Sequence, residues 1–188
     1  PAALERFINR HYPSYWLRSD LDTVVEQAKL VRAAEESRKS LVTHFSTDAF
    51  RAVTEITLFA PNHPRLLAMV AGACTGAGAN IVDAQISTTR DGMALDTIHL
   101  EREFEHAEDE ERRAARIASS IEKLLKGEAR LADVVATKKK PKARLSAFTV
   151  EPQVVIDNTL SDALTVIEIN GLDRPGLLYD VTRPISDP

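Results

Sequence analysis

An α+β fold, with helices packed on one face of an antiparallel sheet, is the fold class that the sequence predicts. One observation is a short pattern that begins at Thr54 and again at Thr165, 111 residues later. Each copy consists of a β-rich run, a polar turn, a proline and an apolar run with helical spacing. The other observation is that runs of the two kinds follow the order β-α-β-β-α-β, which is that of a ferredoxin-like sandwich. We therefore expect one complete unit of this fold and the start of a second.

A helical region precedes the first unit. Residues 4–18 predict a short helix and an aromatic cluster, which we expect to pack on a preceding domain because alone they could bury little surface. The aromatic residues are Tyr12, Tyr15 and Trp16. Ser19 or Asp20 can cap the next helix, which is predicted over 20–39. The apolar stripe of this connecting helix contains Leu21, Val24, Val25, Ala28 and Val31.

The first half of the unit predicts a strand, a helix and a second strand. Residues 53–59 are rich in β-branched side chains and indicate a strand. Pro64 can occupy the first turn of the helix that follows, because its missing N–H is not needed there. Gly76 and Gly78 end this helix, since glycine readily adopts the left-handed conformation of a C-terminal cap. Residues 80–87 are predicted as the second strand.

The second half predicts a hairpin, a helix and a last strand. Asp91-Gly92 is a hairpin-turn signal, and 93–102 returns as the third strand. Residues 108–126 predict a helix with acidic residues first and basic residues last, which suits the helix dipole. Residues 148–156 are predicted as the fourth strand, at a sheet edge or bulge because they include Pro152. In the second copy, 164–170 predict a strand, and a helix follows from 175 until Pro184 disrupts it.

The composition limits the classes of function. The chain has 188 residues and a net charge of −4, which gives no general attraction to nucleic acid or anionic membranes. It contains no apolar run long enough to span a membrane and no signal peptide. The single Cys74 is expected to be buried and indicates a reducing cytoplasm. The basic stretch 137–144 is interpreted as a solvated loop; a nucleic-acid tail is the alternative, which no interleaved aromatic residue supports.

No catalytic or metal-binding motif stands out. The sequence has no glycine-rich phosphate loop, nucleophile elbow, paired CxxC motif or HExxH motif. The histidines, His11, His44, His63, His99 and His106, lack metal-ligand spacing. Asp83, Asp91 and Asp96 could converge on Mg²⁺, although an exposed turn and solvated strands explain them more simply. We expect neither catalytic residues nor a metal site.

The turn of the second copy is the candidate binding feature. Gly176 stands beside the start of the predicted helix, where free N–H groups and the helix dipole favour an anion such as a carboxylate. Asp173 or Asn170 could hold an ammonium or amide group. The alternative is a plain turn with a helix cap.

A family resemblance rests on these residues. Asp173–Leu178, after a β-strand, resembles the signature of ACT domains, small β-α-β-β-α-β modules that often bind amino acids in regulatory proteins. Three further runs are more specific: Ala60–Leu67, Gly78–Gln85 and Asp91–Thr97. Together with His11–Leu17, they resemble the C-terminal third of the bacterial bifunctional uridylyltransferase/uridylyl-removing enzymes. The resemblance covers nearly the whole chain.

The resemblance implies a regulatory region that has no catalysis of its own. Enzymes of this kind modify the PII nitrogen-signalling protein, and the resemblance implies that their paired ACT domains sense glutamine and control the addition and removal of UMP. Mg²⁺ is implied for the longer enzyme and no cofactor for this region. The implied domains are the tail of a preceding HD domain (1–18), a helical linker (19–50), the first ACT domain (51–158) and the start of an incomplete second one (163–188). Since Pro1 is not an initiator Met and the chain stops inside an expected helix, we expect a fragment of a longer protein.

The implied ligand site lies between the paired modules, with one wall from each copy. The candidate residues are Asn62, His63, Pro64, Arg65, Asn80, Ile81, Val82, Asn170, Asp173, Arg174, Pro175, Gly176 and Leu177. Arg65 departs from the ligand-binding pattern, which has glycine at that position. An alternative is a protein-interaction module without a ligand, in which strands 53–59 and 164–170 offer sheet edges and form a homodimer. A third is an ACT module from an unrelated amino-acid-regulated enzyme.

Overall fold

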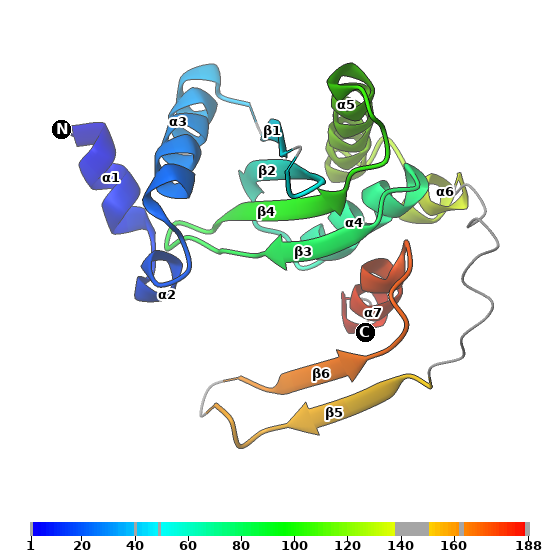
Figure 1. Ribbon diagram of the computed structural model, residues 1–188. Helices are drawn as coiled ribbons and strands as arrows, with labels where there is room; N and C mark the ends of the chain where they lie inside the picture. Colours follow the sequence, from blue (N-terminus) through cyan, green and yellow to red (C-terminus); the bar gives the residue numbers. More distant parts are fainter. Residues whose placement is uncertain (1, 40, 49, 138–150, 162–163, 187–188) are drawn as a thin grey trace.

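The computed structural model describes residues 2–39, 41–48, 50–137, 151–161 and 164–186, which form helices and strands in alternating layers (Figure 1). In chain order the elements are α1 (Ala2–Arg10), α2 (Pro13–Trp16), α3 (Leu21–Ser37), β1 (Val42–Asp48), β2 (Val53–Pro61), α4 (Leu66–Gly76), β3 (Ile81–Gln85), β4 (Met93–Glu101), α5 (Ala107–Leu125), α6 (Leu131–Ala136), β5 (Gln153–Asp157), β6 (Val166–Asn170) and α7 (Leu177–Ser186). Within these ranges no helix is both long and apolar enough to cross a membrane.

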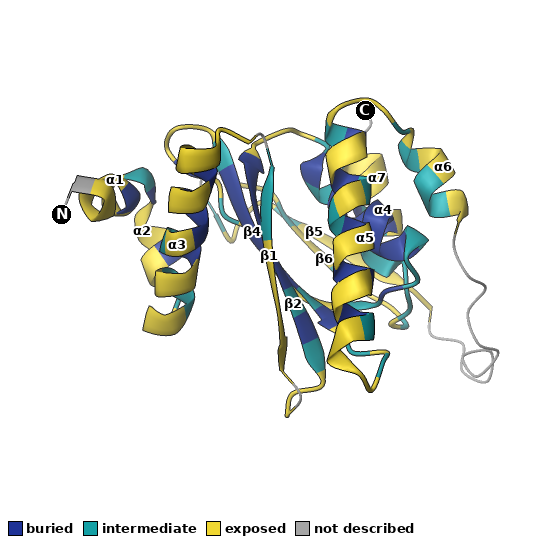
Figure 2. Ribbon diagram, turned by 90° about the horizontal axis from the view of Figure 1, so that it is seen from above, coloured by how far each residue is buried: buried dark blue, intermediate teal, exposed yellow. Residues whose placement is uncertain are grey.

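The main sheet is antiparallel and four-stranded, in the order β1-β2-β4-β3. Its larger core lies under α4 and α5 and includes Leu58, Leu100 and Ile117, each fully buried. A smaller core lies under α3, so that β2 and β4 are buried between helices on both sides (Figure 2). The predicted α+β class and ferredoxin-like sheet are confirmed, with an additional helical layer on the second face.

The fourth strand of the sheet differs from the predicted one. Residues 42–48, expected within the helical linker 19–50, form β1 and pair along their whole length with β2. The Asp48 carboxylate accepts hydrogen bonds from the Phe50 and Arg51 N–H groups, which closes a tight connection to β2. A neighbour joined by so short a turn pairs more readily than a distant segment does. The assignment of the linker to residues 19–50 is corrected accordingly.

The predicted fourth strand, 148–156, belongs elsewhere. Residues 148–150 lie outside the described residues, and the described part falls in β5, which pairs with β6 in a separate two-stranded sheet. Because β1 and β4 flank β2 on both sides, the predicted sheet edge at 53–59 is also wrong. The expectation of an exposed edge for pairing therefore applies only to β6.

The structure extends the internal repeat by one strand. In the first hairpin Val42 lies opposite Phe59, and in the second Gln153 lies opposite Asn170, so each partner is shifted by 111 residues and the register is the same. The helices that follow, α4 and α7, begin 111 residues apart and pack against each other. Each copy of the repeat therefore starts with a hairpin and a helix, and the two copies meet through equivalent helices.

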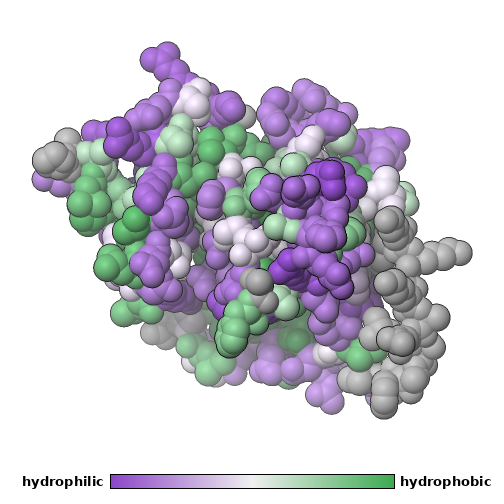
Figure 3. Space-filling model, turned by 45° about the horizontal axis from the view of Figure 1, so that its top comes forward, coloured by the Kyte–Doolittle hydropathy of each residue, from purple (hydrophilic) through white to green (hydrophobic). Residues whose placement is uncertain are grey.

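The N-terminal aromatic cluster packs on the sheet of this chain. Phe7 and Tyr15 are buried with Phe59 and Leu95, whereas Tyr12 and Trp16 remain partly exposed. This corrects the expectation that these side chains need a preceding domain, because α3 and the second face of the sheet provide the apolar surface. Exposed hydrophobic side chains, including Leu4, Ile8, Leu17 and Leu21, remain on these helices, and such side chains gather at the left of the largely hydrophilic face in Figure 3.

Arg10 fixes the N-terminal helices to the tip of the β3–β4 connection. Its guanidinium lies 2.9 Å from a carboxylate oxygen of Glu35 on α3 and 2.9 Å from one of Asp91 in the turn. The Arg90 N–H also donates to the Arg10 carbonyl at 2.8 Å. The predicted turn at Asp91-Gly92 is present, with Gly92 at φ +76°. This turn therefore serves as an anchor for α1.

Helix ends agree with the sequence in three places and differ in two. Asp20 caps α3 by accepting from the Thr23 N–H at 2.8 Å, and Gly78, at φ +74°, follows α4. Helix α6 was not predicted. The disruption expected at Pro184 is absent, because Pro184 lies in the last turn of α7, where only one N–H donor is lost, and the helix continues to Ser186.

Gly76, the last residue of α4, is expected to be intolerant of a side chain. A Cβ at this position would collide with the backbone carbonyl oxygen of Val134 on α6, which cannot rotate away as a side chain could. We expect Gly76→Ala to lower the free energy of unfolding by about 1–3 kcal/mol, the usual cost of overpacking. Urea unfolding followed by circular dichroism measures it. Gly171→Ala, with open space around the new methyl group, is the matched control, and equal unfolding midpoints for the two variants would contradict the expectation.

Candidate functional site

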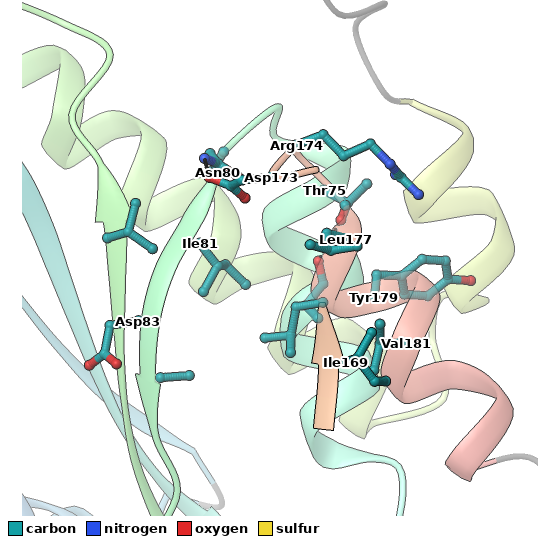
Figure 4. A pocket seen from close by; sticks show the side chains of 16 residues that line it. Thr75, Asn80, Ile81, Asp83, Ile169, Asp173, Arg174, Leu177, Tyr179 and Val181 are labelled. Carbon is teal, nitrogen blue, oxygen red and sulfur yellow. Dashed lines mark hydrogen bonds between the residues drawn. The ribbon is translucent and has the colours of Figure 1, made fainter. Parts of the chain in front are cut away.

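A cavity of about 360 Å³ lies where the two copies of the repeat meet (Figure 4). One wall comes from the second half of α4 and from β3, and includes Thr75, Asn80 and Ile81. The other wall comes from β6, the turn after it and α7, and includes Asp173 and Leu177. This volume lies at the lower end of the range for small-molecule sites, which is 300–1,000 Å³.

The turn before α7 presents backbone to this cavity. Gly176 has φ +91°, a conformation that favours glycine because it has no Cβ. The Leu177 N–H donates to the Arg174 carbonyl, and the Asp180 N–H donates to the Gly176 carbonyl, so the first turn of α7 forms directly after Gly176. The N–H groups of such a first turn carry the positive end of the helix dipole. The turn therefore brings a favourable electrostatic environment for an anion to the cavity wall.

The mouth of the cavity is polar and joins the two copies. The Asn80 side-chain amide donates to the Asp173 carboxylate at 3.1 Å and lies 3.4 Å from a Glu101 carboxylate oxygen. Arg174 extends away from the cavity, as Figure 4 shows, and pairs with Asp180 at 2.6 Å. The Asp173 carboxylate is thus left as the charged group at the mouth.

The interior of the cavity is apolar. Ile81, Ile169 and Leu177 face one another across it, and the buried Tyr179 closes one side (Figure 4). The Thr75 hydroxyl donates to the Ala71 carbonyl at 2.7 Å, so its oxygen remains able to accept a hydrogen bond. A polar mouth over a short apolar interior fits a small molecule with charged ends and an aliphatic body.

The structure brings together part of the predicted site. Seven of the candidate residues line the cavity: Asn80, Ile81, Val82, Asp173, Arg174, Gly176 and Leu177. Asn170 and Pro175 flank these residues in the chain without lining it. The predicted grouping was therefore correct in pairing the strand after α4 with the turn of the second copy.

The turn of the first copy is not part of this cavity, which corrects the predicted wall. Asn62, His63, Pro64 and Arg65 precede α4, whereas Asn80 follows it. Eleven residues of helix separate these two positions, or about 16 Å at 1.5 Å per residue. The Asn62 N–H donates instead to the Gly92 carbonyl at 3.0 Å. A cavity of this size cannot include both ends of the helix.

Several lining residues were missed from the sequence. Thr75, Ile169, Tyr179 and Val181 reach the cavity only because α4 packs against α7. Their apolar or small side chains at helix and strand positions are typical of any core. The only available signal was position, since Tyr179 comes three residues after the turn glycine, Gly176.

Other candidate chemistry is not supported by the described residues. Among them no group of three or more His, Cys, Asp or Glu side chains is placed to hold a metal ion. Burial raises the pKa of the Cys74 thiol to about 12, so it is an inert core residue. Asp83 and Asp91, two of the weighed magnesium ligands, instead pair with His99 and Arg10.

Comparisons with known proteins agree with this arrangement. The family model described as ACT domain matches residues 54–124. A "Bifunctional uridylyltransferase/uridylyl-removing enzyme" of Nitrobacter hamburgensis is 53% identical over 97% of this chain. Proteins of the same name from Rhodopseudomonas palustris and Nitrobacter winogradskyi are 52% and 54% identical, over 98% and 97% of the chain. The chain spans about a fifth of the length of each, since it covers 20% of them.

Proposed function

Because the chain contains an ACT domain and matches the C-terminal ACT region of bifunctional uridylyltransferase/uridylyl-removing enzymes along nearly its whole length, we propose that it senses glutamine for such an enzyme. The ACT domain within these relatives supports a regulatory role. In the proposal, the region itself is not catalytic and has no cofactor. The longer protein, acting in the cytoplasm with Mg²⁺, would add UMP to PII and remove it.

The single observation that carries the proposal is the cavity between the two copies of the repeat. Glutamine has a carboxylate, an ammonium group and a side-chain amide on a short aliphatic body. The first turn of α7 beside Gly176 suits the carboxylate, and the Asp173 carboxylate suits the ammonium group. Asn80 can exchange hydrogen bonds with the side-chain amide. These three groups come from both copies of the repeat.

The proposed mechanism is a population shift. The cavity is formed by two elements distant in sequence, Asn80–Ala84 and Asp173–Val181, so a ligand that contacts both favours one arrangement of the two copies. The rest of the enzyme would respond to that arrangement, and the coupling would be the difference in glutamine affinity between the two arrangements. The alternative of an unrelated amino-acid-regulated enzyme is less favoured, given the identity over 97% of the chain.

Asp173→Ala tests the proposal. We expect the affinity for L-glutamine, measured by isothermal titration calorimetry, to fall about tenfold or more, because a charge-assisted hydrogen bond contributes about 1.5–3 kcal/mol. L-Glutamate is the control ligand, and Asp133→Ala, an exposed change on α6, is the control variant. Unchanged affinity in Asp173→Ala would remove this residue from the site. Failure of the parent chain to bind glutamine would count against the sensor itself.

A second candidate, an interaction module that forms homodimers, is favoured by one specific observation. One side of β6 pairs with β5, and no other described strand pairs with its second side. Val154, Val155 and Ile156 on the adjoining strand are also more than half exposed. Open strand edges with exposed apolar residues promote pairing between chains. Light scattering that gives the mass of a monomer would remove this candidate.

A further inference from the structure

The second face of the sheet contains a continuous line of hydrogen bonds between side chains. At its N-terminal end the Tyr15 hydroxyl donates to the Gln27 side-chain carbonyl at 2.6 Å. The Gln27 amide then donates to the Thr97 hydroxyl at 3.1 Å, which lies 3.1 Å from the Thr57 hydroxyl. These four side chains are at most 6% exposed. They connect α2 and α3 to the two central strands.

The line continues to the edge of the sheet. The Thr57 hydroxyl donates to the Glu55 carboxylate at 3.2 Å. His99 lies between two carboxylates, with Nε2 3.3 Å from Glu55 and Nδ1 3.2 Å from Asp83. Asp83 is on β3, the edge strand that lines the cavity. The described contacts therefore link Tyr15, near the N-terminus, to the strand that forms one wall of the proposed site.

The hydrogen bonds of this line all point the same way. A threonine hydroxyl has one proton, and Thr57 gives its proton to Glu55, which can only accept when ionised. Thr97 must therefore donate to Thr57, and it accepts from the Gln27 amide. Gln27 in turn accepts from Tyr15, whose pKa burial raises to about 12, so that its phenol remains a donor. Hydrogen bonds aligned in this manner strengthen one another, and a change at one end affects the next.

A β-bulge in β3 connects this line to the cavity. Ile81 pairs with Leu100 and Asp83 pairs with His99, so Val82 is the extra residue between two consecutive partners. Without the bulge Ile81 and Asp83 would share a face. With it, Ile81 packs on the core beside the cavity, while the Asp83 side chain points away from the other labelled residues in Figure 4. A displacement of β3 by a bound molecule therefore acts directly on the Asp83–His99 contact.

We propose that the state of the cavity is transmitted through the β3 bulge and this line of side chains to the N-terminal helices, with Gln27 as the essential link between helix and sheet. The inference rests on the proposed function for the identity of the molecule in the cavity. The line itself, Tyr15–Gln27–Thr97–Thr57–Glu55–His99–Asp83, is present without it. The N-terminal helices are then the part of this region that responds to the effector.

Trp16 reports on the far end of the line. It is the only tryptophan of the chain, and its ring centroid lies 5.0 Å from that of Tyr15. It does not line the cavity, so its fluorescence does not respond to a bound molecule by direct contact. Intrinsic fluorescence of the full chain therefore reads the N-terminal helices separately from binding.

The first experiment titrates the chain with L-glutamine and records heat and Trp16 emission in parallel. In Gln27→Met, which keeps the length of the side chain without its amide, we expect the dissociation constant to stay within about twofold of the parent. The emission change should be lost. Thr97→Val interrupts the line at the next residue and should give the same result if Gln27→Met fails to fold. Gln153→Leu, at an exposed position on β5, is the control that should keep both signals.

An emission change retained in both variants at full binding would overturn the proposal while the glutamine sensor remained. A second experiment needs no ligand, so it decides the matter even if glutamine does not bind. Asp83→Asn and Tyr15→Phe are combined, and the urea unfolding equilibrium is measured for each single change and for the pair. We expect their effects to be non-additive by about twofold or more in that equilibrium, and additive in a Gln27→Met background. Additive effects in the parent would overturn the line; Tyr12→Phe, outside it, is the matched partner for Asp83→Asn.

Discussion

Replacing Glu110 with alanine is expected to lower the free energy of unfolding by about 3–5 kcal/mol, which is the range for breaking a buried ion pair. Glu110 has no exposed surface, and its carboxylate accepts hydrogen bonds from the Glu103 and Phe104 N–H groups and from the Thr54 hydroxyl, at 2.7–2.8 Å. The Arg113 guanidinium lies 2.6 Å away. In Glu110→Ala this buried guanidinium loses its closest partner, and two buried N–H groups lose their acceptor.

Urea unfolding followed by circular dichroism measures the effect, with Glu111→Ala as the control at an exposed position one residue further along α5. Although burial alone raises the pKa of Glu110, the bonds from Phe104, Thr54 and Glu103 and the Arg113 charge together lower it. A lowered pKa in the folded state contributes stability above the unfolded value of 4.5 and loses it as the pH falls through the folded value. The gap between parent and variant should therefore narrow in acid. A loss as small as that of Glu111→Ala would mean that this cluster does not stabilise the fold.

Asp96→Asn is expected to change stability in the opposite direction as the pH rises. Asp96 is 2% exposed on β4, and burial raises its pKa from 3.8 to about 6, partly offset by the Ser87 N–H, which donates to it at 3.2 Å. A raised pKa means that the folded state holds the proton longer than the unfolded state. The parent therefore loses stability as the pH rises from 3.8 to about 6, by about 2–3 kcal/mol for a two-unit shift.

Asparagine does not titrate, so Asp96→Asn should gain that amount relative to the parent between pH 4 and pH 7, whatever its stability at pH 4. Urea unfolding at the two pH values gives the difference directly. Asp20→Asn is the matched control, because the Thr23 N–H lowers the pKa of Asp20 and the sign must reverse. A parallel pH dependence of parent and Asp96→Asn would show that Asp96 is ionised at no cost in the folded state.

The sequence predicted the elements with strong periodicity and missed those defined by pairing. β2, α4, β4 and α5 combine an apolar pattern with a turn or cap at each end. β1 has mostly exposed side chains and no apolar alternation, because it is an edge strand covered on only part of its surface. Residues 148–156 contain the more β-rich run, and no local rule indicates that the shorter connection of β1 to β2 takes precedence.

The candidate site was predictable where backbone chemistry identifies it. Gly176 and Asp173 form a recognisable turn before a helix, and Asn80 follows a helix-ending glycine. The contribution of Tyr179 depends on the packing of α4 against α7, which no local pattern specifies. The turn at Asn62–Arg65 has the same local pattern as its equivalent and a different location, so the pattern alone cannot distinguish which copy contributes to the cavity.

The packing of α4 against its own sequence equivalent, α7, has a consequence for stoichiometry. Equal partners that meet in this way form each cleft twice, once with the strand of one copy and the turn of the other, and once with these parts exchanged. In the exchanged cleft Arg65 would occupy the place of Gly176, and its side chain would fill the space that a ligand needs beside the backbone. The pair is thus balanced in its packing and one-sided in its capacity. A single effector molecule per pair gives simple hyperbolic saturation, so any steepness in the response must come from elsewhere in the longer enzyme.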